Sequence, residues 1–277
     1  MDIQWYPGHM TKTKRQIEAD LSLCDTVAEI VDSRVPLASR SDVLDKITGN
    51  KPRILVLNKC DTADNSLTKE WAAFYKERGL FPLICDCRSG FGVNGFVPLL
   101  KVLLADLLER RRLKGTSGKT LRVMVVGVPN SGKSSFVNRL AGGRKTEVGD
   151  RPGVTRGKQW LRVTKEVELL DTPGVLTPKF EDNAVAMRLA FTGAIKDNIL
   201  DTTDVSLQLA KYLFQNYPNG ITERYGVNEY SLRFLEELAL SRKFLCSGGV
   251  ADTERAAAVF LDEFRAGKLG RVTLEKP

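Results

Sequence analysis

The stretch LRVMVVGVPNSGKSS, residues 121–135, carries most of the information on the fold. Its first half is an apolar, β-rich run, and residues 127–134 match the pattern G-x-x-x-x-G-K-[ST]. A glycine-rich loop between a strand and a helix lets backbone N–H groups surround phosphates, and the helix adds its positive end. We expect Lys133 to contact the β- and γ-phosphates and Ser134 to bind Mg²⁺; the alternative is a turn without a ligand. The predicted nucleotide contacts in this loop are Asn130, Ser131, Gly132, Lys133, Ser134 and Ser135.

Apolar, β-rich runs recur on both sides of this stretch. They are residues 26–32, 53–58, 83–87, 121–127, 159–163 and 166–171. Helical patterns, such as 69–79 and 96–108, lie between most of these runs. Strands that alternate with helices predict an α/β fold, with a mostly parallel sheet and helices on both faces. The polar, basic segment 109–119 is interpreted as a linker.

The strand pattern ends near residue 180, and helical patterns follow. They are residues 183–196, 204–216, 230–243 and 252–265. We therefore predict a nucleotide-binding domain over residues 1–179 and a smaller all-α C-terminal domain over 180–277. The first part has 30 Lys/Arg against 20 Asp/Glu, whereas the second has 12 against 14. A basic excess favours polyanionic partners, so an anion-binding surface is expected mainly in the first domain.

Composition narrows the class of protein. Apolar residues make up 42% of the 277, enough for a real core. No run approaches the roughly 18 apolar residues that a membrane span requires, and the N-terminus has no signal-peptide pattern. The five cysteines form no C-x-x-C pair and there is one histidine, so a structural zinc site is not expected. We expect a cytoplasmic protein without a membrane partner.

Two further motifs follow the phosphate loop. Asp171-Thr-Pro-Gly174 ends another β-rich run, where Asp171 could hold Mg²⁺ through water and the Gly174 N–H could meet the γ-phosphate. Between the motifs lies GDRPGVT, whose Thr155 could complete the Mg²⁺ coordination. Each signal is weak alone, and each gains weight from its place after the phosphate loop.

The motif Asn58-Lys59-Cys60-Asp61 follows the run RILVLN. Asp61 can accept hydrogen bonds from the ring N–H and the exocyclic amine of guanine. Adenine has no such amine, so a site built for these bonds rejects ATP. We expect Asn58 and Lys59 to brace the loop and cover the base. A surface turn with this sequence is the alternative.

The order of the motifs is unusual, because the base-reading motif precedes the phosphate loop. Cutting a compact fold elsewhere and joining its ends keeps the same contacts, so the sequence predicts a circularly permuted P-loop GTPase domain. The loop at Asp171–Gly174 then runs directly into the helical domain. Nucleotide state would be coupled to the orientation of that domain through ordering of this segment.

Two further stretches, WYPGHM (5–10) and VDSRVP (31–36), complete a set of motifs that extends over the whole chain and is typical of one protein family. The chain resembles the circularly permuted GTPases that assemble ribosomes, in particular the bacterial ribosome biogenesis GTPase A family. The resemblance implies a precursor of the large ribosomal subunit and its rRNA as partners, and GTP with Mg²⁺ as cofactors. It also implies hydrolysis that times release. Where the family has S-A-K beside the base, this chain has Asp86-Cys87-Arg88, so we expect backbone contacts from Asp86 and Cys87.

Hydrolysis requires a group that orients water, and Val175 replaces the usual glutamine after the D-x-x-G motif. The resemblance assigns catalysis to His9, together with Lys133; the alternative is that His9 caps the first helix. Turnover is expected to be slow alone and stimulated by the large subunit. Asn130 resembles the asparagine of potassium-activated GTPases and could help to bind K⁺. We expect a monomer when free.

Basic residues mark two candidate RNA contacts. Lys12, Lys14 and Arg15 lie on the first predicted helix, opposite a core face with Ile17 and Cys24, and a solvated face is the alternative. In the helical domain a stripe could include Arg188, Lys196, Arg242 and Lys243. Two rival functions remain open: a GTP switch for a protein or membrane partner, and an RNA-binding scaffold with a non-hydrolysing nucleotide site.

Overall fold

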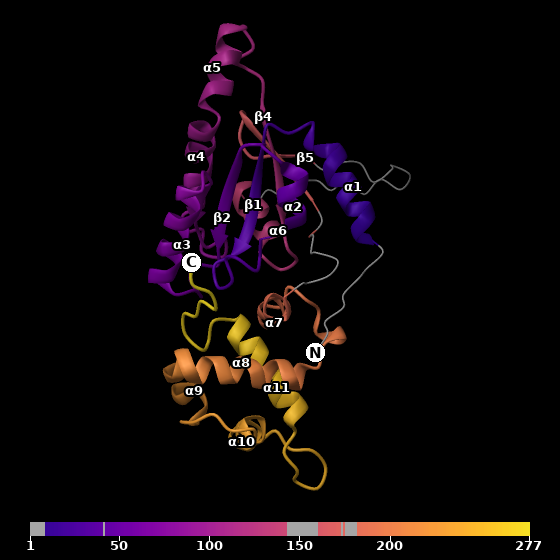
Figure 1. Cartoon of the computed structure of the whole chain (residues 1–277), viewed down its shortest axis with the longest axis vertical. Coiled ribbons are helices and arrows are strands. Elements are labelled where there is room, and N and C mark those ends of the chain that lie inside the picture. The colour runs from indigo at the N-terminus through magenta and orange to yellow at the C-terminus, as the bar shows by residue number, and fades with distance from the viewer. Residues whose placement is uncertain (1–8, 41, 143–159, 173, 175–181) are drawn as a thin grey trace.

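The computed structural model describes residues 9–40, 42–142, 160–172, 174 and 182–277, with the backbone alone for 9–14 and 42–43. The strands are β1 (Thr26–Asp32), β2 (Arg53–Asn58), β3 (Phe81–Ile84), β4 (Leu121–Gly127), β5 (Trp160–Arg162) and β6 (Val167–Asp171). The α-helices are α1 (His9–Leu21), α2 (Asp42–Thr48), α3 (Asn65–Glu77), α4 (Phe96–Leu103), α5 (Ala105–Leu113), α6 (Lys133–Leu140), α7 (Asn183–Phe191), α8 (Thr202–Asn216), α9 (Pro218–Tyr225), α10 (Phe234–Ser241) and α11 (Thr253–Arg265). Figure 1 shows a sheet half above a helical half.

The strands form one sheet in the order β3-β2-β1-β4-β6-β5. Neighbours from β3 to β6 are parallel, and β5 runs antiparallel to β6 at the edge. Every residue of β1 and β2 is buried. Such continuous burial is typical of a parallel sheet covered on both faces. The predicted α/β fold with a mostly parallel sheet is confirmed.

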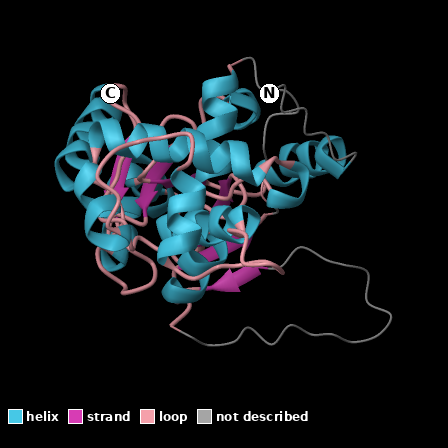
Figure 2. Ribbon diagram, turned by 90° about the horizontal axis from the view of Figure 1, so that it is seen from below, coloured by secondary structure: helices cyan, strands magenta, loops and turns pink. Residues whose placement is uncertain are grey.

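Alternate residues of each strand face opposite layers of helices. Ala28 and Ile30 of β1 belong to a core with Phe96 of α4 and Phe136 of α6, whose rings meet edge to face at 5.1 Å. Val31 points the other way and packs in a core with α3. Figure 2 shows helices on both sides of the strands. All parallel strands therefore end at one edge, where the sequence motifs follow them.

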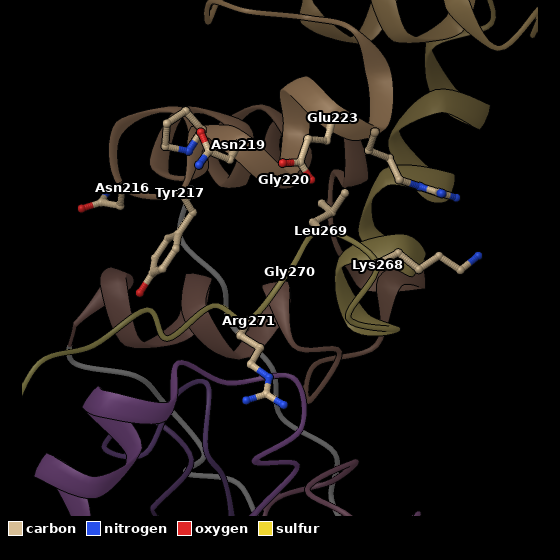
Figure 3. A pocket seen from close by; sticks show the side chains of 11 residues that line it. Asn216, Tyr217, Asn219, Gly220, Glu223, Lys268, Leu269, Gly270 and Arg271 are labelled. Atoms are coloured by element: carbon tan, nitrogen blue, oxygen red, sulfur yellow. The ribbon is translucent and has the colours of Figure 1, made fainter.

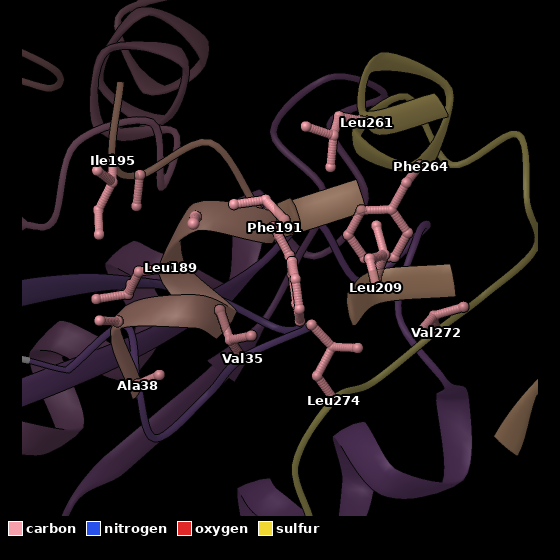
Figure 4. Packing of buried hydrophobic residues seen from close by; sticks show 14 of the residues in the cluster. Val35, Ala38, Leu189, Phe191, Ile195, Leu209, Leu261, Phe264, Val272 and Leu274 are labelled. Atoms are coloured by element: carbon pink, nitrogen blue, oxygen red, sulfur yellow. The ribbon is translucent and has the colours of Figure 1, made fainter. Parts of the chain in front are cut away.

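The helical half consists of α7 to α11 and shares a core with the sheet half. Figure 4 shows Val35, which follows β1, beside Phe191 and Leu274, and Phe264 belongs to the same cluster. These side chains are at most 6% exposed. After α11 the chain turns back, so that residues 266–277 return to the sheet half (Figure 1). The two halves are thus joined by apolar packing as well as by the chain.

Several predicted boundaries were wrong, among them that of helix 96–108, which is two helices, α4 and α5, with Leu104 between them. Segment 109–119 is not all linker, because α5 continues to Leu113; basic residues suit the negative end of a helix, and Arg112 pairs with Glu109 at 2.8 Å. The predicted strand 83–87 is β3, which ends at Ile84. The predicted helix 183–196 ends at Phe191, where Gly193 has φ of 75° and stops the helix. Within the described residues, no helix has the length and apolar character needed to span a bilayer.

Candidate functional site

The phosphate loop connects β4 to α6 at the carboxyl edge of the sheet. Its glycines are required by geometry: Gly132 has φ of 98°, and a Cβ there would overlap the side-chain amide of Asn58. Ser131 and Lys133 are buried, whereas Ser134 and Ser135 are exposed in the first turn of α6. The loop therefore presents hydroxyl groups and backbone N–H groups at the positive end of a helix, as predicted for phosphate binding.

Lys133 is held inside this loop. Its Nζ donates a hydrogen bond to the Val128 carbonyl at 2.8 Å. Burial lowers the pKa of Lys133 from 10.5 to about 8, and the charge of Asp171 opposes that effect. A buried ammonium group with a lowered pKa gains from a nearby anion, which restores the charged form. This environment suits a phosphate ligand.

Asp171 and Gly174 come to the same loop from β6. Asp171 pairs in register with Val125 of β4, and its Oδ1 is buried without a hydrogen-bond partner among the described residues. Burial raises the pKa of Asp171, and Lys133 opposes this. A Cβ on Gly174 would lie 3.0 Å from the Pro129 nitrogen, so the backbone approaches the phosphate loop closely. The unpartnered carboxylate oxygen and the exposed Ser134 hydroxyl are the hard oxygen ligands that Mg²⁺ requires.

Asn58 ties three loops together. Its Nδ2 donates to the Ser131 carbonyl at 2.9 Å, and its Oδ1 accepts from the Cys87 N–H at 3.1 Å. Lys59 has φ of 61° and reaches the Asn130 carbonyl with Nζ at 2.6 Å. The two residues thus brace the base-reading motif against the phosphate loop, as the sequence predicts.

The expected guanine acceptor, Asp61, is partly exposed. Its side chain is 31% exposed and lies 3.7 Å from the Arg88 guanidinium, which is itself 78% exposed. Its neighbour Cys60 donates its backbone N–H to the Cys85 carbonyl at 3.2 Å, and burial raises the pKa of the Cys60 thiol to about 11. The Asp61 carboxylate is therefore accessible to a nucleotide base, and the neighbouring Cys60 thiol is uncharged.

Asp86 shapes the loop beside the base. Its carboxylate accepts the backbone N–H groups of Arg88 at 2.8 Å and Ser89 at 2.9 Å, which turns the chain and ends β3. Burial alone would raise the pKa of Asp86, but these hydrogen bonds outweigh burial and lower it. The Asp86 side chain is thus used by its own loop, and base contacts from Asp86 and Cys87 stay a prediction.

The sequence reasoning missed a buried ion pair beside this site. Asp32, in the VDSRVP stretch, binds Arg34 at 2.7 Å and Lys59 at 2.9 Å. Burial alone would raise the pKa of Asp32, but the two cations hold it well below its usual range. It also missed a link from the phosphate loop to the helical half, in which the Asn130 amide donates to the Gly193 carbonyl at 2.6 Å. The VDSRVP stretch and Asn130 were both noted in the sequence, but the residues that they contact could not be predicted from it.

A hollow of about 380 Å³ opens where these loops face the helical half. Its lining includes Lys59 and Asn130 from the two nucleotide loops and Lys196 from the segment after α7. The base-reading motif and the phosphate loop therefore line one hollow, and Asp171 at the end of β6 acts on Lys133 of the phosphate loop through its charge. This is the arrangement expected of a nucleotide-binding P-loop domain.

Comparison with known proteins agrees with this geometry. The family described as "50S ribosome-binding GTPase" matches residues 122–230. Two relatives called "Ribosome biogenesis GTPase A", from Bacillus cereus and Priestia megaterium, are each 44% identical over the whole chain, covering 95% and 98% of their own lengths. The chain belongs to the ribosome biogenesis GTPase A family. The crystal structure of "GNP-bound YlqF from T. maritima" is similar too, with 32% identity, a TM-score of 0.67, and coverage of 96% of this chain and 98% of that one.

Membership of the ribosome biogenesis GTPase A family confirms the resemblance and the circularly permuted GTPase fold. The roles of the predicted site residues stay predictions. Two of these residues cannot be placed in the site: Thr155 lies outside the described residues, and His9 begins α1 without a described side chain. In the predicted RNA stripe, Arg188 faces Glu275 at 3.4 Å and Arg242 faces Glu263 at 3.6 Å. The stripe therefore stays a prediction, with two of its cations already in ion pairs.

Proposed function

We propose that this GTPase binds GTP and Mg²⁺ at the carboxyl edge of its sheet and hydrolyses GTP during a late step of large ribosomal subunit assembly. The observation that carries the proposal is the joining of the base-reading motif to the phosphate loop through Asn58 and Lys59. The relatives' names support the ribosomal role. Within this proposal, residues 1–179 bind nucleotide, residues 180–277 form a helical domain, and the protein is a cytoplasmic monomer when free.

Different residues of the site bind the base, the phosphates and Mg²⁺. Asp61 accepts the two guanine N–H groups, and Lys133 places its positive charge at the β- and γ-phosphates. Ser134 and Asp171, with Thr155, hold Mg²⁺, which supplies charge neutralisation at the phosphates. The Gly174 N–H binds the γ-phosphate. Each group acts in a site that is already braced by buried hydrogen bonds, which limits reorganisation during the reaction.

Two finer roles belong to the same proposal. His9 orients the attacking water, because Val175 cannot hold it, and the large subunit positions the N-terminal turn that carries His9. Asn130 helps to bind K⁺ beside the phosphates, where added positive charge stabilises the transition state. That role requires its side-chain oxygen to face the phosphates while its amide nitrogen donates to Gly193.

The test is a GTPase assay with and without purified large subunits, in potassium and in sodium buffers. We expect slow turnover of the free protein, faster turnover with subunits, and higher rates in potassium. Nucleotide binding without turnover in every condition would support the scaffold alternative instead. Turnover that subunits leave unchanged would favour a switch for another protein or a membrane.

Base choice is tested separately with Asp61→Asn. The substitution exchanges an acceptor for a donor, so the preference for GTP over xanthosine triphosphate should fall by on the order of 10²-fold or more. Competition binding with the two nucleotides measures this ratio. If the variant keeps the parent's preference, guanine does not lie at Asp61.

A further inference from the structure

The end of α11 and the chain after it form a strap, residues 264–275, between the helical half and the sheet half. Figure 3 shows Lys268, Leu269 and Gly270 leaving the helices, with Arg271 directed towards the sheet half. On the helical side the strap lies against α9 so closely that a Cβ on Gly220 would overlap the Leu269 carbonyl. The strap is therefore seated on the helical half before it reaches the nucleotide loops.

Its next residues hold the turn that carries Asp61. The Val272 N–H donates to the carbonyl of Thr62, the residue after Asp61, at 3.0 Å. Thr62 in turn closes the base-reading turn, because its N–H and its hydroxyl both donate to the Lys59 carbonyl, at 3.1 and 3.0 Å. The strap thus supports this turn at Thr62, whereas Lys59 joins the same turn to the phosphate loop.

Thr273 bridges two loops with a single hydroxyl. Its Oγ1 accepts the Asp64 N–H at 3.0 Å and donates to the Ser33 carbonyl at 3.4 Å. Asp64 caps the start of α3, just after the base-reading turn. Thr273 is only 1% exposed, so water cannot replace these bonds without local opening.

The end of the strap is bound to the loop after β1. The Leu274 N–H donates to the Arg34 carbonyl at 2.7 Å, and the Glu275 carboxylate accepts the N–H groups of Leu37 at 2.6 Å and Ala38 at 3.0 Å. At the start of the strap, the Arg34 guanidinium donates to the Arg265 carbonyl at 3.2 Å. These bonds fasten the strap to the same loop whose Asp32 pairs with Lys59.

The start of the strap is also bound to the helical half. The Arg265 side chain binds Asp197 at 2.7 Å and the Phe191 carbonyl at 3.1 Å, so the start of the strap is held by the end of α7 and the segment after it. A displacement of the helical half would pull on Thr62 and Asp64 through the strap. Hydrogen-bond recognition of a base depends on placing the acceptor to within about 0.5 Å, so even a small displacement matters.

We propose that the strap is a positioning element for guanine recognition, with Thr273 as its central residue. It holds the turn at Asp61 in the geometry that binds the base, and lifting it speeds GDP release without changing the phosphate chemistry. The inference rests on the proposed placement of guanine at Asp61. If the strap acts in this way, the docking of the helical half regulates the rate of nucleotide exchange.

Two pairs of variants of the full chain test this role. Thr273→Val removes the bridging hydroxyl at nearly constant shape, and Thr273→Ser restores it. Gly267→Ala places a Cβ 2.6 Å from the Thr62 side chain at φ of 75°, whereas Gly226→Ala carries the same strain at φ of 73° with nothing within 4 Å. Each pair separates the contact with the base-reading turn from a general effect of the substitution.

The readout is the rate of release of fluorescently labelled GDP, chased by excess GDP. Thr273→Val should release GDP roughly three- to tenfold faster, as expected for the loss of buried hydrogen bonds. Gly267→Ala should also release GDP faster. Thr273→Ser and Gly226→Ala should stay within about twofold of the parent, and single-turnover hydrolysis at saturating GTP should be unchanged in all four. Ser206→Ala is the stability control, because it removes a buried hydroxyl bond to the Ala257 carbonyl, 3.1 Å long, inside the helical half.

The outcomes are distinct. Unchanged GDP release in Thr273→Val and Gly267→Ala, together with the expected loss of GTP preference in Asp61→Asn, overturns the strap alone. Unchanged base preference in Asp61→Asn overturns the guanine site itself. If Ser206→Ala speeds release as much as Thr273→Val does, the effect is loss of stability and the positioning role is wrong.

Discussion

Asn58 offers a direct test of how the nucleotide site is held together. Its side chain is buried, with the residue 2% exposed, and it makes one hydrogen bond to Ser131 and one to Cys87. Asn58→Ala removes both bonds and leaves a buried carbonyl and a buried N–H without partners. Each unsatisfied group costs about 1–3 kcal/mol, so the free energy of unfolding should fall by about 2–6 kcal/mol.

Asn58→Asp separates the two bonds. The carboxylate keeps an acceptor for the Cys87 N–H but replaces the donor that faces the Ser131 carbonyl, so two oxygens would oppose each other. We expect a loss of stability and weaker GTP binding, because the phosphate loop loses its brace. The preserved side-chain volume means that a cavity cannot explain the result.

Urea unfolding measures the stability, and titration with a fluorescent guanine nucleotide measures the affinity. Asn216→Ala is the control, because it removes one exposed hydrogen bond to the Tyr212 carbonyl and should change stability by less than about 0.5 kcal/mol. The reasoning fails if Asn58→Ala unfolds at the parent's urea midpoint and binds GTP with the parent's affinity.

Two further predictions concern charge and catalysis. The free protein has a Lys133 pKa of about 8 and bound phosphates raise it, so GTP affinity should be flat below pH 8 and fall up to about tenfold per pH unit above it. Calorimetric titration from pH 6.5 to 9 checks this, with Lys133→Arg as a variant whose charge does not titrate there; a flat profile for the parent would contradict it. His9→Ala should slow subunit-stimulated single-turnover hydrolysis by roughly 10²–10⁴-fold while GTP affinity and melting temperature stay close to the parent's. Parent-like hydrolysis by a folded variant would mean that another group holds the water.

Much of the nucleotide site was predictable because its motifs are local. A glycine-rich loop, a base-reading motif and Asp171 each follow an apolar run, and parallel strands bring their carboxyl ends to one edge. Asn58, Ser131 and Lys133 could therefore be assigned to one site from their positions alone. The permuted motif order did not hinder this, since it changes connectivity and leaves contacts unchanged.

The sequence patterns predicted the ends of strands and helices less well than the motifs of the site. The run after Pro82 reads as a strand to residue 87, but the Asp86 carboxylate captures two N–H groups and turns the chain after Ile84. The basic segment at 109–119 reads as a linker, yet its first residues continue α5 to Leu113. At Asp86, hydrogen bonds from the side chain to the backbone outweighed the β-rich composition of the run.

Only the tertiary structure could reveal the strap and the Arg34 links. Val272 meets Thr62, and Arg34 meets Arg265, across more than 200 residues of chain, so no periodicity or spacing marks either contact. The residues after α11 form neither a helix nor a strand, which leaves them without a sequence signature. Sequence alone specified the chemistry of the site, because that chemistry resides in short motifs. The way the C-terminal segment holds the site depended on the packing of the two halves, because backbone hydrogen bonds form with any residue type that folding brings into place.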